Sequence, residues 1–282
     1  MSLSSKTTVS RLNRKLHEEF AAWRTRDLSQ EGLVFLYLDG LYAGVRFGTS
    51  EKEAVLVAHG IRKDGSRSVL SIRFGGREST VSWAEVLHDL ETRGLPLPYL
   101  VISDVNPGLI KAIREVWPDV PRQRCIVHRT RNILDKMPKS LHDEARKALN
   151  RIWYAEDLDT AIEAAKAFVK KYGKEYESAV ECLMEGLPDC LTFFRFPKEY
   201  RKRIRTSNPL ERTFKEVRRR TKVVGRFPSE SSALAVIYGI LTIEAGKWRG
   251  FTFGPTTVIE LQQVSDNLKT DPIVLDLERE AA

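Results

Sequence analysis

The chain has 282 residues, of which 42% are hydrophobic and 30% are charged, so its length allows one large domain or two modest ones. Its three cysteines exclude a disulfide framework and favour a reducing cytoplasm, and no apolar stretch is long enough to cross a bilayer, so we expect no membrane contact. The net charge of +8 points to a polyanionic partner.

The first two dozen residues predict an amphipathic helix. Val9, Leu12, Leu16, Phe20 and Trp23 recur at spacings of three and four residues, as the apolar face of a helix does. No partner element precedes this helix, so the chain reads as though it began in mid-element, after a longer upstream region.

The next segment predicts three strands. An apolar run at residues 34–38 leads into Asp39, and residues 54–61 form a second run. The turn at residues 63–66, Lys-Asp-Gly-Ser, then returns the chain into a third strand at residues 68–74.

Helices and strands then alternate. A helix is expected at residues 81–90, and a second apolar run at residues 99–103 leads into Asp104. The sequence Asn-Pro-Gly at residues 106–108 predicts the start of another helix, and a further short strand is expected at residues 124–127.

Both apolar runs that end in an aspartate read as buried strands. If these two strands are parallel neighbours, Asp39 and Asp104 meet at one edge of the sheet and need a shared proton or a cation, usually a divalent metal. The alternative is that a strand-ending Asp caps the next helix, as Asp104 could for the helix after Pro107. The order of the elements, with the first and fourth strands as neighbours, predicts an α/β fold with a ribonuclease H-like mixed sheet.

The second half of the chain is mostly helical in its periodicity. Residues 129–185 contain no strand-like run, and we interpret residues 130–204 as an all-helical insertion. The next helix opens at residues 207–209, Ser-Asn-Pro, with a cap former followed by Pro at the first helical position. A mostly apolar helix at residues 233–245 should pack against the sheet, whereas the tail after Thr257 is acidic, weakly patterned and expected to be peripheral.

The positive charge is concentrated in residues 195–226, which contain thirteen Lys and Arg and three Glu. This segment carries +10 and leaves the rest of the chain at −2. A basic block in a near-neutral chain is typical of a surface that binds phosphate backbone, although most charge runs are simply solvated helix faces. The candidate nucleic-acid-binding residues are Arg201, Lys202, Arg203, Arg205, Arg212, Lys215, Arg218, Arg219, Arg220, Lys222 and Arg226.

Glu211 lies in the first turn of the helix predicted after the insertion, where a carboxylate is favoured electrostatically in any case. A functional interpretation is that this helix crosses the open end of the sheet and brings Glu211 to Asp39 and Asp104. Three carboxylates would then bind two Mg²⁺ or Mn²⁺ ions, as required for phosphodiester hydrolysis or strand transfer. Lys215 and Arg218 share the helical face of Glu211 and would line the same groove.

Three motifs stand out: residues 123–132 (Gln-Arg-Cys-Ile-Val-His-Arg-Thr-Arg-Asn), the Thr-Ser-Asn-Pro-Leu-Glu segment that ends at Glu211, and the Arg-Arg-Arg-Thr-Lys…Gly-Arg-Phe-Pro run that follows it. Together these motifs resemble the bacterial Mutator-type insertion-sequence transposases. The resemblance extends from Ser10 to about Phe253 and keeps the family's order of motifs.

The resemblance implies a ribonuclease H-like DNA transposase with an Asp-Asp-Glu active site, formed here by Asp39, Asp104 and Glu211. It implies two divalent cations, Mg²⁺ or Mn²⁺, as cofactors. The expected partners are insertion-sequence ends, target DNA and further copies of the chain in a synaptic complex, in the bacterial cytoplasm at the nucleoid. The expected boundaries are a remnant of an N-terminal helical DNA-binding region at 1–30, a catalytic domain at 31–129 and 205–255, a helical insertion at 130–204 and a C-terminal tail at 256–282.

The family's Cys-x-x-His pair falls on Cys125 and His128, which implies a role beside the active site, such as contacting DNA or orienting a metal-bound group. From the residues alone we favour a satisfied core pair over half of a zinc site, because Cys182 and Cys190 are unsuitably spaced. Trp153 is a candidate stacking platform for an unpaired base, and core packing is the alternative that we favour.

The chain departs from the family pattern in two places. The family commonly places Gly after its second Asp, whereas this chain has Val105, which could shift Asp104. The family also has a longer N-terminal helical region that reads the terminal repeats, of which only residues 6–26 would remain. Two rival functions therefore stay open: a ribonuclease H-like nuclease without strand transfer, and a catalytically silent DNA-binding remnant.

Overall fold

The structure is a computed structural model that describes residues 6–42, 45–46, 54–75, 79–104, 106–247 and 251–273. The chain divides into two compact units. The first unit comprises residues 1–98, 106–118 and 208–253, and the second comprises residues 99–105, 119–207 and 254–282. Segments far apart in the sequence therefore fold together within each unit.

Three antiparallel strands form the centre of the first unit: β1 (Leu33–Leu41), β2 (Ala54–Arg62) and β3 (Arg67–Gly75). Nearly every residue of β1 and β2 is buried, as expected for strands that are covered on both faces. The register pairs Asp39 of β1 with Val57 of β2. The three strands predicted from the apolar runs are confirmed.

The turn between β2 and β3 needs a glycine. Gly65 has a φ of +80°, in the left-handed region that other residues rarely adopt. The Asp64 carboxylate accepts a hydrogen bond from the Ser66 amide at 2.8 Å, which closes the turn. The Lys-Asp-Gly-Ser segment thus makes the reversal that its composition predicts.

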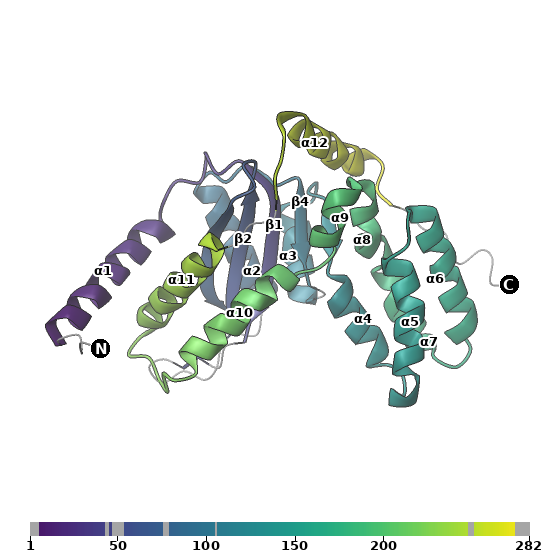
Figure 1. Cartoon of the computed structure of the whole chain (residues 1–282), viewed down its shortest axis with the longest axis horizontal. Coiled ribbons are helices and arrows are strands. Elements are labelled where there is room, and N and C mark those ends of the chain that lie inside the picture. Colours follow the sequence, from purple (N-terminus) through teal and green to yellow (C-terminus); the bar gives the residue numbers. More distant parts are fainter. Residues whose placement is uncertain are drawn as a thin grey trace. The chain divides into compact units, whose positions relative to one another are not determined.

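Helices cover both faces of these strands. In Figure 1, α10 and α11 lie in front of the strands, and α2 and α3 lie behind them. The bounds of the helices in this unit are α1 Lys6–Arg24, α2 Thr80–Thr92, α3 Pro107–Val116, α10 Asn208–Thr221 and α11 Glu230–Gly246. Polar side chains cap α2, α3 and α11, where Ser79, Asn106 and Ser229 each accept a hydrogen bond from the amide three residues later.

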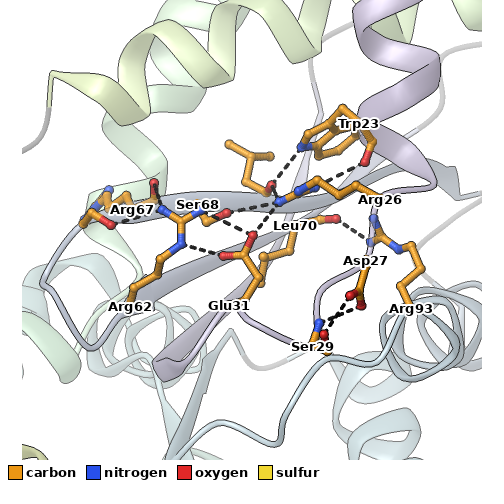
Figure 2. Close-up of polar contacts among 12 residues, drawn as sticks. Trp23, Arg26, Asp27, Ser29, Glu31, Arg62, Arg67, Ser68, Leu70 and Arg93 are labelled. Carbon is orange, nitrogen blue, oxygen red and sulfur yellow. Dashed lines mark hydrogen bonds and ion pairs between the residues drawn. The ribbon is translucent and has the colours of Figure 1, made fainter.

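Helix α1 is attached to β3 by polar contacts at its C-terminal end (Figure 2). The Trp23 indole N–H and the Arg26 guanidinium both donate hydrogen bonds to the Val69 carbonyl, each at 3.1 Å. The Glu31 carboxylate accepts hydrogen bonds from Arg26 at 3.0 Å and from Arg62 at 2.6 Å. This network fixes the path of the chain from α1 into β1, and the amphipathic helix predicted at the start of the chain is confirmed.

The second unit contributes two parallel strands, β4 (Leu100–Ser103) and β5 (Arg122–Arg124). The five strands have the order β3-β2-β1-β4-β5 in one mixed sheet. The predicted mixed α/β class is confirmed.

Most of the second unit is helical. Its helices are α4 Ile126–Leu134, α5 His142–Trp153, α6 Leu158–Tyr172, α7 Glu177–Glu185, α8 Leu187–Leu191, α9 Lys198–Ile204 and α12 Pro255–Thr270, with 3₁₀ helices η2 Lys139–Leu141 and η3 Thr192–Arg195. No helix in the described part of the chain is long and apolar enough to span a membrane.

One sequence prediction in this unit was wrong in part. The strand expected at residues 124–127 ends at Arg124, and Ile126 already begins α4. The β-branched pair at 126–127 suggested a strand, but Ile126, Thr130 and Ile133 repeat at helical spacing and are buried on one face of α4. The weakly patterned tail contains α12, which buries residues at positions 261, 265 and 268, four and three residues apart.

Candidate functional site

Two of the three predicted catalytic acids, Asp39 and Glu211, belong to the first unit. Asp39 is buried near the end of β1. Glu211 is partly exposed in the first turn of α10, and α10 packs against β1. A buried strand therefore fixes the backbone of Asp39, and the helix packed on that strand carries Glu211.

The third acid, Asp104, directly follows β4 in the second unit and is partly exposed. The sequence left open whether Asp104 caps the following helix. Asn106 is the N-cap of that helix instead, and its side-chain oxygen accepts the Leu109 amide hydrogen bond at 3.0 Å. The capping interpretation of Asp104 is therefore wrong.

The metal site expected from these acids stays a prediction. Within the described ranges, no group of three or more His, Cys, Asp or Glu side chains is arranged so that it could hold a metal ion. The chemistry of the predicted donor set does fit Mg²⁺ or Mn²⁺, because carboxylate oxygens are the hard ligands that these ions prefer.

Helix α10 presents a row of exposed cations. Its apolar residues Leu210, Phe214 and Val217 recur at spacings of four and three and are buried. Because this stripe faces the protein, the basic residues between its members point away from it. The exposed cations of α10 and the turn after it are Arg212, Lys215, Arg218, Arg219, Arg220, Lys222 and Arg226.

Glu216 partly neutralises this row. It forms ion pairs with Arg219 at 2.7 Å and with Arg220 at 2.6 Å, within one helical turn. Hydrogen bonds from these two side chains lower the pKa of Glu216 to about 2. Among the described residues, no carboxylate pairs in this way with Arg212, Lys215 or Arg218, so the charges of these three are not neutralised by an ion pair.

The cations of α9, in the second unit, are of two kinds. Lys202 and Arg203 are exposed. Arg201 instead donates hydrogen bonds to the carbonyls of Phe196 at 2.8 Å and Phe194 at 2.7 Å, and the guanidinium carbon of Arg205 lies 4.2 Å from the centroid of the Tyr154 ring. Arg201 and Arg205 therefore stabilise the second unit, which leaves them less able to contact a phosphate.

The Cys125–His128 pair lies at the start of α4 in the second unit. Cys125 has no exposed surface, and its sulfur accepts a hydrogen bond from the Ser207 amide at 3.3 Å. Burial acts to raise the pKa of the Cys125 thiol, but hydrogen bonds with His128 and Ser207 outweigh burial and hold that pKa below its ordinary value. The two side chains thus interact with each other, and the role of the pair stays a prediction.

Trp153 is the last residue of α5 and is only 1% exposed. Its indole N–H donates a hydrogen bond to the Thr130 hydroxyl at 2.9 Å. This burial favours the packing role, because stacking on a base would require the ring to become exposed.

The sequence analysis overlooked a group of buried arginines in the second unit. Arg122 and Arg124 of β5 are both buried, and both form ion pairs with Asp189 of α8. Arg129 of α4 is also buried and lies 3.6 Å from the Glu185 carboxylate. The sequence Arg-Gln-Arg in strand β5 could have indicated this group, because buried guanidinium groups need carboxylate partners from elsewhere in the fold.

The comparison that decides the family covers nearly the whole chain. A family model described as "Transposase, Mutator family" matches residues 1–250. The chain belongs to this family. The resemblance drawn from the motifs around Cys125, His128 and Glu211 is thereby confirmed.

Three curated relatives of this Mutator-family transposase are named as transposases of insertion sequences. The transposase for IS6120 of Mycolicibacterium smegmatis is 40% identical over 245 residues, which are 87% of this chain and 76% of the relative. The transposase for ISRM5 of Rhizobium meliloti is 37% identical over 86% of this chain and 61% of its own length. The transposase for IST2 of Acidithiobacillus ferrooxidans is 34% identical over 91% of this chain and 86% of its own.

A solved structure titled "Drosophila P element transposase strand transfer complex" also aligns with the chain. The alignment covers 95% of this chain and 79% of that one, with 11% identity and a TM-score of 0.33. A likeness at this level does not establish a shared fold.

Proposed function

We propose that this chain acts as an insertion-sequence transposase, which cleaves and joins DNA strands at an Asp-Asp-Glu site in a ribonuclease H-like fold. The observation that carries the proposal is the Mutator-family match over residues 1–250, together with relatives named as insertion-sequence transposases. The strand order β3-β2-β1-β4-β5 supports the fold assignment, because it makes the first and fourth strands neighbours, as expected for a ribonuclease H-like sheet.

In this proposal Asp39, Asp104 and Glu211 bind two divalent cations through their carboxylate oxygens. When bound, the two ions would activate a water or a 3′-hydroxyl and stabilise the leaving oxygen of the phosphodiester. The buried β1 backbone holds Asp39 rigidly, and the packing of α10 on β1 restrains Glu211. Such restraint lowers the free-energy cost of holding three negatively charged carboxylates at one site.

DNA would bind along the exposed cations of α10. Arg212, Lys215 and Arg218 are the strongest candidates, because no described carboxylate neutralises them as Glu216 neutralises part of the row. Contacts of this kind are to the phosphate backbone and carry little sequence information. We further propose that several copies assemble on the two ends of the element, since joining both ends to one target requires them to be held together.

The test is a cleavage and joining assay on DNA that carries the terminal repeats of the element, with Mg²⁺ or Mn²⁺. Asp39→Ala, Asp104→Ala and Glu211→Ala should each abolish cleavage while DNA binding stays nearly intact, because the acids act on the metal ions and not on the DNA. Glu115→Ala is a suitable control, since Glu115 is an exposed acid on α3.

Two outcomes would count against the proposal. Full cleavage by any of the three variants would remove that acid from the site. A pre-cleaved end with a free 3′-hydroxyl should also yield joined product, and cleavage without joining would indicate a nuclease instead of a transposase.

A further inference from the structure

Cys125 connects three segments of the second unit by hydrogen bonds. Its backbone N–H donates to the Ser103 carbonyl at 2.7 Å, and its sulfur accepts from the Ser207 N–H at 3.3 Å. The next residue, Ile126, donates its N–H to the Arg205 carbonyl at 3.1 Å. Residues 125 and 126 are therefore tied both to the end of β4 and to the segment that follows α9.

The two segments held in this way lead directly to two of the proposed catalytic acids. Ser103 is the last residue of β4, and Asp104 follows it. Ser207 is the residue before α10, which carries Glu211 in its first turn. Cys125 is therefore hydrogen-bonded both to the residue before Asp104 and to the residue before α10.

The Cys125 sulfur provides the hydrogen-bond acceptor for the buried Ser207 amide. Ser207 has no exposed surface, so its N–H cannot turn to water, and a buried amide without a partner is costly. The amide lies ahead of the first helical residue, Asn208, where no earlier turn of α10 exists to accept its hydrogen bond. The thiol of Cys125 supplies that acceptor, and His128 one turn further along α4 contacts the same thiol.

We propose that Cys125 is a positioning residue for the transposase reaction, which holds Ser207, the residue before α10, and Ser103, the last residue of β4, in a fixed arrangement within the second unit. The inference rests on the proposed function, because it assigns the effect of Cys125 to the acids that follow these two anchored residues. Cys125 itself has no exposed surface, so its role is to position other residues and not to contact DNA.

The experiment compares Cys125→Val, which keeps a side chain of similar size and removes the acceptor, with Cys125→Ser, which keeps an acceptor. Cys190→Val is the matched control, because Cys190 is equally buried in the same unit and no described hydrogen bond reaches its sulfur. Single-turnover cleavage of terminal-repeat DNA is measured with Mg²⁺, together with the DNA dissociation constant, the melting temperature and amide hydrogen exchange across residues 205–210.

We expect Cys125→Val to lower the single-turnover rate constant by about tenfold, as the loss of one buried hydrogen bond implies, with an unchanged dissociation constant. Hydrogen exchange at Ser207 should become faster in this variant. Cys125→Ser should recover most of the rate, and Cys190→Val should match the wild type. A merely structural role would instead lower the reaction amplitude, through a smaller folded fraction, and leave the rate constant unchanged.

The inference is overturned if Cys125→Val cleaves at the wild-type rate constant, if the Ser and Val variants are equally slow, or if Cys190→Val is as slow as Cys125→Val. Should the wild type and Cys190→Val both fail to cleave, the proposed function fails, and the exchange of the Ser207 amide alone decides the structural part. Unchanged exchange in Cys125→Val would then refute the anchoring of Ser207.

Discussion

Replacing Glu31 with Gln tests how α1 and the strands of the first unit are held together (Figure 2). The Glu31 side chain is only 9% exposed, and its two oxygens accept hydrogen bonds from Arg26 at 3.0 Å and from Arg62 at 2.6 and 3.3 Å. Glutamine keeps one acceptor but places an N–H₂ group against guanidinium donors. Because both arginines retain some contact with water, we expect the free energy of unfolding to fall by about 2–3 kcal/mol, less than for a fully buried pair.

The effect should depend on pH in a defined direction. Burial acts to raise the pKa of Glu31, but Arg62 and Arg26 outweigh burial and hold that pKa below its ordinary value of 4.5. The folded state therefore keeps the carboxylate ionised at a pH where the unfolded chain has begun to protonate it. The stabilisation is complete above the unfolded-state pKa and is lost as the pH falls through the lower folded-state pKa.

Urea denaturation at neutral and acidic pH, followed by tryptophan fluorescence, measures both effects. Trp23 is a local reporter, since the guanidinium carbon of Arg26 lies 5.3 Å from the centroid of its ring. Glu18→Gln is the control: Glu18 pairs with Arg14 at 3.9 Å on the surface of α1, so its loss should cost less than about 0.5 kcal/mol. Equal destabilisation by the two variants, or a Glu31→Gln effect that persists unchanged into acid, would refute the reasoning.

Two further predictions concern the basic helix and the turn between β2 and β3. Replacing the arginines at 218–220 with Ala should weaken DNA binding and reduce the slope of log K against log salt by about 2, because Glu216 already offsets part of their charge. Anisotropy titrations over a range of salt concentrations measure this slope, and an unchanged slope would place the interface elsewhere. The control removes three exposed cations of α5, at Arg146, Lys147 and Arg151. Gly65→Ala should lower the unfolding free energy by about 1–3 kcal/mol, because its φ is +80° and the new methyl group would overlap the Phe251 carbonyl oxygen. In the same urea assay Gly225→Ala, with no atom within 4 Å of the added carbon, should be near neutral, and equal effects at the two glycines would contradict the argument.

The site was only partly predictable from the sequence. The basic residues of α10 were predicted to bind phosphate backbone, and they are exposed because Leu210, Phe214 and Val217 form the buried face of the helix. Arg201 and Arg205 were grouped with them by sequence distance, yet both are engaged in contacts within the second unit. Charge composition cannot separate these cases, since it does not show which carbonyls or rings lie nearby.

The errors in the fold have a similar origin. Ile126 and Val127 have the same β-branched character in a strand and in a helix, and α4 forms because its neighbours at 130 and 133 share a buried face. Asp104 and Asn106 could both have capped α3, and only the backbone geometry at Asn106 shows that its oxygen reaches the Leu109 amide.

The sequence by itself determined the mixed α/β class, the positions of strands β1 to β4 and the family to which the chain belongs. These properties follow from local periodicity, turn chemistry and short motifs, each of which is formed by residues that are close together in the sequence. The tertiary structure alone decided which charges are engaged and which are exposed, and that the Cys125 sulfur accepts the Ser207 amide 82 positions further along the chain. Hydrogen bonds and ion pairs depend on distances of a few ångströms between segments remote in sequence, and no local pattern encodes those distances.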